Sequence, residues 1–130
     1  MKTNNSSGRA FAVMVGVWLI IKVVINMLIN GLSIGDLPGD IGQLIIAGAE
    51  AVLLYLGLKY TNYVIAAIMA LTVVIHVPGN IGMMFSVDTL LQAVIYLAEG
   101  AADIILAVVI CITPSIREHF TNTPADLSEK

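Results

Sequence analysis

Four polar side chains recur on one face of an apolar stretch near the carboxyl end of the chain: Gln92, Tyr96, Glu99 and Asp103. Their spacing of four, three and four residues places them within roughly 60° of one another on a helix of 3.6 residues per turn. A face of this kind can hold a proton, a cation or a small polar ligand, or it can clamp helices together through hydrogen bonds. Both interpretations require a helix that carries the face into the protein interior.

An earlier stretch repeats part of this pattern. Gln43 and Glu50 stand seven residues apart, as do Gln92 and Glu99. Upstream, the sequence Val-Val-Ile followed by a polar residue occurs at 23–26 and again at an offset of fifty, and this offset slips to 49 in the Gln/Glu part. The pattern predicts one helical hairpin written twice, with a pseudo-two-fold axis along the membrane normal. The polar residues related by the first offset are Asn26 and His76, and Asn30 and Asn80.

The composition indicates that the bilayer is the main solvent. Hydrophobic residues make up 58% of the chain and charged residues only 12%, against about 25% charged in soluble domains. Crossing a bilayer takes about 20 apolar residues in a helix, and four stretches approach this length, at about 10–29, 41–58, 60–77 and 89–112. We therefore expect an all-α, four-helix transmembrane bundle.

Four charged residues fall inside these stretches: Lys22, Glu50, Glu99 and Asp103. A charge at the bilayer centre costs roughly 2.5–3.5 kcal/mol on insertion scales, so together they approach about 10 kcal/mol if exposed to lipid. We expect them to converge inside the bundle, with an ion pair between Lys22 and one acid and a proton shared among the rest. On the same face of the first span lie Trp18 and Asn26, with Asn30 beside it.

The charges flanking the spans predict the orientation. Residues 1–9, the connection near residue 59 and residues 114–130 contain basic side chains, whereas residues 31–40 and 78–88 contain Asp but no Lys or Arg. The positive-inside rule then places both termini in the cytoplasm. We expect a loose leader at 1–9, a membrane domain at 10–113, a loose tail at 114–130, and outer loops in which Pro38 and Pro78 stop the helices.

Several function classes are disfavoured. A net charge of −3 without a basic cluster argues against nucleic-acid binding. Cys111 is the single cysteine, which excludes an internal disulfide and a Cys-based zinc centre. No HExxH, GxSxG or CxxC motif occurs, so we predict no catalytic residue. We predict no metal site either, although His76 beside carboxylates leaves zinc or iron as a minor alternative.

The chain resembles the DoxX-like family of small four-span bacterial membrane proteins. The resemblance lies in Lys22 near the end of span one, Glu50 followed by Leu-Leu-Tyr-Leu-Gly-Leu at 53–58, and a third span that ends at His76. It implies a subunit of a redox-linked membrane complex, with Lys22, Glu50 and His76 at the family's polar positions. The chain departs from that pattern in its extra acids Glu99 and Asp103 and in its glycine-poor first span.

Three functions remain open. The leading hypothesis is a non-catalytic subunit of a bacterial-type plasma membrane that binds a small ligand or a quinone headgroup, with a homodimer or membrane-complex partner and no cofactor motif of its own. The second is a proton- or cation-coupled transporter or channel, and the third is a structural or immunity-type scaffold. The ligand site is expected at Glu50, Glu99, Asp103, Lys22, His76, Asn26 and Tyr96, and its entrance at Gln43, Gln92, Asn30 and Asn80.

Overall fold

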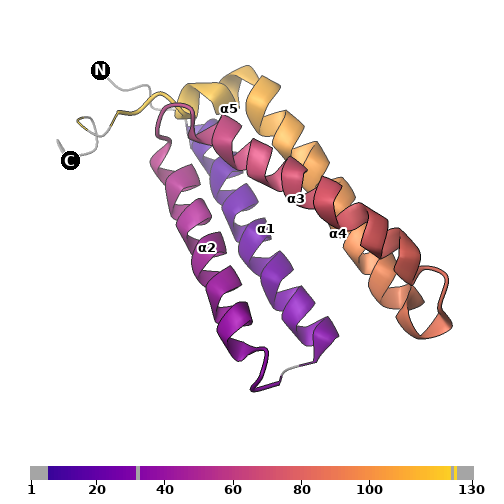
Figure 1. Cartoon of the computed structure of the whole chain (residues 1–130). Coiled ribbons are helices and arrows are strands. Elements are labelled where there is room, and N and C mark those ends of the chain that lie inside the picture. Colours follow the sequence, from indigo (N-terminus) through magenta and orange to yellow (C-terminus); the bar gives the residue numbers. More distant parts are fainter. Residues whose placement is uncertain (1–5, 32, 124, 126–130) are drawn as a thin grey trace.

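The computed structural model describes residues 6–31, 33–123 and 125. The helices in this part of the chain are α1 (Ser6–Asn30), α2 (Leu37–Leu56), α3 (Thr61–Met83), α4 (Val87–Ile112) and α5 (Pro114–His119) (Figure 1). Helices α1 to α4 are each long and apolar enough to cross a membrane. The predicted all-α bundle of four membrane-length helices is therefore confirmed.

The third helix runs further than expected, because Pro78 does not stop it. Helix α3 continues through Pro78 to Met83, so the connection to α4 is shorter than the predicted loop at 78–88. Proline removes one helical hydrogen bond, a cost that membrane helices tolerate where neighbouring groups compensate. Pro38, by contrast, lies in the first turn of α2, where no intrahelical donor is needed.

The four long helices pack as two hairpins. Helix α1 packs mainly against α2, and α3 mainly against α4, with fewer contacts between the pairs. Figure 1 shows the hairpins meeting near α5 and diverging toward the α1–α2 and α3–α4 loops. We call these the closed end and the open end. Within the first hairpin the backbones approach closely, since a Cβ on Gly16 would lie 2.9 Å from Ala51.

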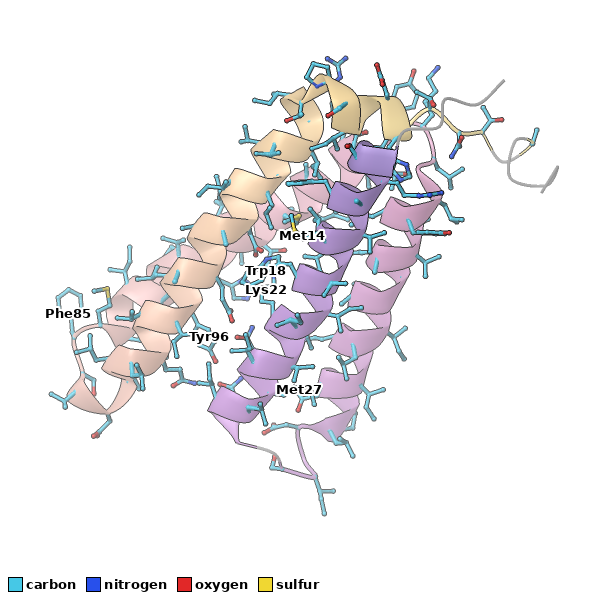
Figure 2. The ribbon with its side chains drawn as sticks, turned by 180° about the vertical axis from the view of Figure 1, so that it is seen from behind. Met14, Trp18, Lys22, Met27, Phe85 and Tyr96 are labelled. Carbon is cyan, nitrogen blue, oxygen red and sulfur yellow. The ribbon has the colours of Figure 1, made fainter. Side chains whose placement is uncertain are left out.

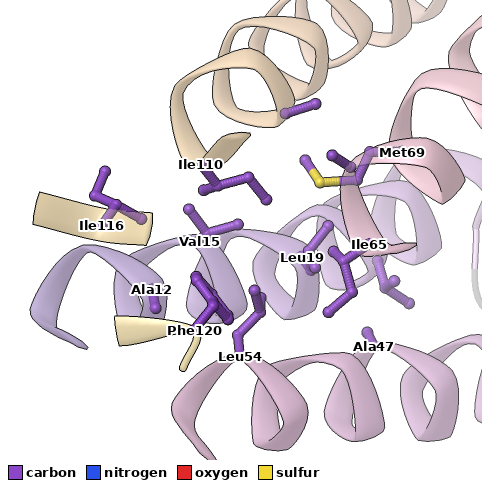
Figure 3. Packing of buried hydrophobic residues seen from close by; sticks show 13 residues of the cluster. Ala12, Val15, Leu19, Ala47, Leu54, Ile65, Met69, Ile110, Ile116 and Phe120 are labelled. Carbon is purple, nitrogen blue, oxygen red and sulfur yellow. The ribbon is translucent and has the colours of Figure 1, made fainter. Parts of the chain in front are cut away.

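The buried apolar core lies toward the closed end. All five helices and the residue after α5 contribute to it, and Leu54, Ile65 and Ile110 are among its fully buried members (Figure 3). Many apolar side chains on the outer faces, such as Ile45 and Val74, are exposed, as expected where lipid replaces protein as the neighbour. The core thus fixes the two hairpins to each other at one end.

The segment at 114–130 is not a loose tail over the part that the structure describes. Residues Pro114–His119 form α5, and Ile116, His119 and Phe120 are buried. The His119 ring hydrogen-bonds the carbonyl of Leu54 at 2.7 Å, and Asn122 donates to the carbonyl of Leu56, also at 2.7 Å. Sequence patterning missed this packing because a six-residue helix carries too little periodicity to be recognised.

The expected leader is also partly helical, because α1 begins at Ser6. Lys2 and Lys130, two of the basic residues behind the predicted orientation, lie outside the described residues. Arg9 lies in the first turn of α1, Lys59 in the α2–α3 connection and Arg117 in α5. Figure 1 shows these three parts of the chain at the closed end. Asp36 and Asp40 belong to the opposite, open end.

Gly57 should be sensitive to substitution. It caps α2 with φ of +64°, a left-handed conformation, and a Cβ there would collide with the backbone carbonyl of His119. We expect Gly57→Ala to lower the free energy of unfolding by at least about 1–2 kcal/mol, the cost of the left-handed conformation alone. Denaturation in detergent micelles measures this.

Gly48→Ala is the matched control, since Gly48 lies within the same helix and a Cβ there meets nothing within 4 Å. It should leave stability unchanged or raise it, because alanine favours helix over glycine by about 1 kcal/mol. Equal stability of the two variants would contradict both the left-handed cap at Gly57 and the packing of His119 against it.

Candidate functional site

A cavity of about 590 Å³ lies between the hairpins and is lined by residues of all four long helices. Its volume is within the usual range of small-molecule sites, about 300–1,000 Å³. Of the eleven residues predicted for the site and its entrance, ten line this cavity: Lys22, Asn26, Asn30, Gln43, Glu50, His76, Asn80, Tyr96, Glu99 and Asp103. Gln92 does not line it but hydrogen-bonds two residues that do.

The inner polar group joins α1 to α4. Lys22 Nζ lies 2.6 Å from Asp103 Oδ2, and Trp18 Nε1 donates to Asp103 Oδ1 at 2.7 Å. The Lys22 and Asp103 side chains are only 16% and 4% exposed, so the pair is largely desolvated. Figure 2 shows Trp18 and Lys22 on the side of α1 that faces α4. The ion pair expected between Lys22 and one acid therefore forms, and Asp103 is that acid.

Trp18 is not among the residues predicted for the site, and its hydrogen bond to Asp103 gives it a polar role there. The available signal was its position four residues before Lys22, which puts both side chains on one helix face. An indole N–H that is removed from water normally finds an acceptor. With both donors in place, each oxygen of Asp103 has a partner.

A second polar group joins the same two helices nearer the open end. Gln92 Nε2 donates to Asn30 Oδ1 at 2.6 Å and to the Tyr96 hydroxyl at 3.1 Å, and that hydroxyl donates to Asn30 Oδ1. Side chains thus connect α1 and α4 at two levels, one nearer the closed end and one nearer the open end. This arrangement fixes one wall of the cavity.

Glu99 and Asn26 lie between these two groups. Glu99 is 7% exposed, and the Asn26 side chain lies close enough to act on its carboxylate. Nevertheless, Glu99 Oε2 and Asn26 Oδ1 are both buried without a hydrogen-bond partner. Buried polar atoms normally have partners, and an unsatisfied one costs about 1–3 kcal/mol. These two oxygens, on residues that line the cavity, therefore each lack a donor.

Glu50 and His76 contribute the other two walls. Glu50, on α2, is half-buried and makes no hydrogen bond or ion pair with the residues that the structure describes, although Lys22 and Asp103 are close enough to act on it electrostatically. His76, on α3, contacts the carbonyl of Thr72 through Nδ1 at 2.8 Å. Because a carbonyl can only accept, Nδ1 carries a proton in this contact.

The described residues contain no group of three or more His, Cys, Asp or Glu side chains placed to hold a metal ion. The zinc or iron alternative for His76 thus gains no support from the geometry. The arrangement instead suits an organic ligand with hydrogen-bond donors, because two lining residues, Glu99 and Asn26, each have a buried acceptor oxygen without a partner.

No protein-family model, no curated protein and no solved structure matches this chain. The function must therefore be argued from the cavity itself.

The ion pair makes a prediction about stability. Lys22→Met leaves Asp103 buried without its cation, and Asp103→Asn leaves Lys22 without its anion. Each should destabilise the protein by about 3–5 kcal/mol, the usual cost of breaking a buried pair from one side. The double variant should lose less than the sum, with a coupling free energy of about 0.5–3 kcal/mol.

Unfolding of the four proteins of this double-mutant cycle in one detergent gives the coupling energy directly. Asp88→Asn, in the first turn of α4 and outside the cavity lining, is the control for removing one carboxylate from that helix. Strict additivity of the two single variants would contradict the ion pair.

Proposed function

We propose that this chain is a multi-pass membrane protein that binds a small polar ligand in the cavity between its hairpins. The observation that carries the proposal is Glu99, whose carboxylate lines the cavity and keeps one oxygen buried without a partner. The Asn30, Gln92 and Tyr96 side chains bond to one another, whereas Glu99 Oε2 has no partner. A binding site leaves some groups for the ligand.

The proposal includes a duplicated origin for the two hairpins, related by an axis along the membrane normal. It is supported by the positions of the repeat-related residues, because Asn26 and His76, Asn30 and Asn80, and Glu50 and Glu99 all line the one cavity. Residues related by such an axis would face a shared space from opposite sides. The ligand would then lie near the axis.

The proposed orientation places the closed end in the cytoplasm and the open end outside a bacterial-type plasma membrane. It is supported by Arg9, Lys59 and Arg117 at the closed end, against Asp36 and Asp40 at the open end. A ligand would accordingly enter from the outer side.

The resemblance to DoxX-like proteins adds a role as the subunit of a redox-linked complex, or as a homodimer, with a quinone headgroup as ligand. This is supported only by the placement of Lys22, Glu50 and His76 on the cavity wall. Any electrons would belong to a partner protein.

Cysteine labelling tests whether the cavity is open to water. In a Cys111→Ser background, Thr72→Cys places a thiol on the cavity wall, and the change is mild because the Thr72 hydroxyl bonds only a carbonyl of its own helix. Val74→Cys is the control, since Val74 is 66% exposed on the same helix but does not line the cavity. Thr72→Cys should react several times faster with a membrane-impermeant methanethiosulfonate added outside.

Methanethiosulfonates react with water-exposed thiolates, so a thiol surrounded by lipid is protected. Equal protection of both positions would mean that lipid or protein fills the space, and the proposed binding site would be lost. Reaction only from the cytoplasmic side would retain the cavity and reverse the orientation.

Transport is the second candidate, favoured by the absence of an ion-pair partner for Glu50 among the described residues. Our proposal of binding without transport predicts no flux of protons or common cations in proteoliposomes. A pH-dependent flux that Glu50→Gln abolishes would instead establish a coupled transporter.

A further inference from the structure

We infer that the ligand is an amphipathic primary or secondary amine in its protonated form, with its ammonium group bound by Glu99 and Asn26 and attracted by the charge of Glu50. This inference rests on the proposed function and assigns the chemical class of the ligand.

The charges around the cavity favour a cation. The ionisable lining residues are Glu50, Glu99, Asp103, Lys22, His76 and Tyr96. Lys22 is paired with Asp103, so no Lys or Arg remains among the lining residues to neutralise the other two acids. Carboxylates held away from water require either a positive partner or a proton. The cavity therefore selects for positive charge, with a proton as the competing occupant.

The unpartnered atoms favour a cation that has N–H groups. Glu99 Oε2 and Asn26 Oδ1 are both acceptors, and the Asn26 side chain lies close enough to act on the Glu99 carboxylate. One ammonium group has two or three donors and can satisfy both oxygens together once the two side chains turn toward it. A quaternary ammonium has none and normally relies on an aromatic cage. Tyr96 is the single aromatic lining residue, and its hydroxyl is bound to Asn30, so no cage is present.

The entrance is acidic and the wall is apolar. A second hollow at the open end contains Asp36 and Asp40, and it shares Asn30 and Gln43 with the main cavity. Clefts lined by one sign of charge concentrate ligands of the opposite sign. Deeper in the cavity, apolar side chains contributed by α2 and α3 offer a surface for a hydrocarbon body: Ile46, Met69 and Val73. An inorganic cation would gain nothing from that surface.

Three matched probes test the inference with the protein in phosphatidylcholine nanodiscs at neutral pH. They are 2-phenylethylamine, its N,N,N-trimethyl analogue and 3-phenylpropionate. Trp18 is the single tryptophan of the chain and hydrogen-bonds Asp103 on the cavity wall, so its fluorescence reports on a new charge in the cavity. Thermal stability gives an independent reading, because a ligand that binds the folded state stabilises it.

The amine should bind, and both other probes should bind at least about tenfold more weakly. Glu99→Gln should weaken amine binding by about tenfold or more, since a carboxamide retains the shape and loses the charge. Glu50→Gln should weaken it as well. Asp88→Asn removes a carboxylate from α4 outside the cavity. Measured in the same nanodiscs, this control variant should have unchanged affinity for the amine.

Equal binding of all three probes, or amine binding that survives both Glu→Gln substitutions, would overturn the amine assignment while retaining a ligand site. No binding by any probe, together with reaction of Thr72→Cys from outside, would overturn the amine assignment and leave a water-filled cavity. No binding together with protection of Thr72→Cys would remove the proposed function itself.

Discussion

The ion pair between Lys22 and Asp103 is the interaction on which the account of this molecule depends. It joins α1 of one hairpin to α4 of the other in a segment where lipid offers no polar alternative, and Trp18 completes the coordination of the carboxylate. A charge left unpaired there would cost several kcal/mol. The pair also engages the one lysine of the cavity wall, so Glu50 and Glu99 remain without a cation. This contact thus adds to the apolar core in joining the hairpins, and it determines the charge of the space between them.

The closed end contains the core that stabilises the fold, and the open end leads to the proposed binding site. Apolar side chains from all five helices fill the closed end, and α5 packs against the α2–α3 turn. Toward the open end the helices diverge, and polar side chains line the gap. The two copies of the proposed duplication differ at a position that has a different role in each hairpin. Asp103 corresponds to Leu54 at the offset of 49, and Leu54 is fully buried in the core while Asp103 carries the ion pair.

Much of this arrangement could be predicted from the sequence, because spans of apolar residues and the cost of charges in lipid leave few alternatives. Those two constraints brought Lys22, Glu50, Glu99 and Asp103 to one interior space. Helix ends were less predictable, since the effect of Pro78 depends on tertiary surroundings that local sequence does not contain. The choice of Asp103 over the two glutamates as the partner of Lys22 depends on distances between helices. The docking of α5 depends on the fit of His119 against Leu54 and Gly57.

The most direct test of the central claim is a dipolar-coupling measurement by solid-state NMR on the protein in lipid bilayers. It would use ¹⁵N-labelled lysine side chains and ¹³C-labelled aspartate carboxyls. A contact of 2.6 Å between Lys22 Nζ and Asp103 Oδ2 predicts strong dephasing of one lysine signal, and Asp103→Asn should abolish it. Absence of any lysine–aspartate coupling in the unsubstituted protein would contradict the ion pair and the charge assignment of the cavity that follows from it.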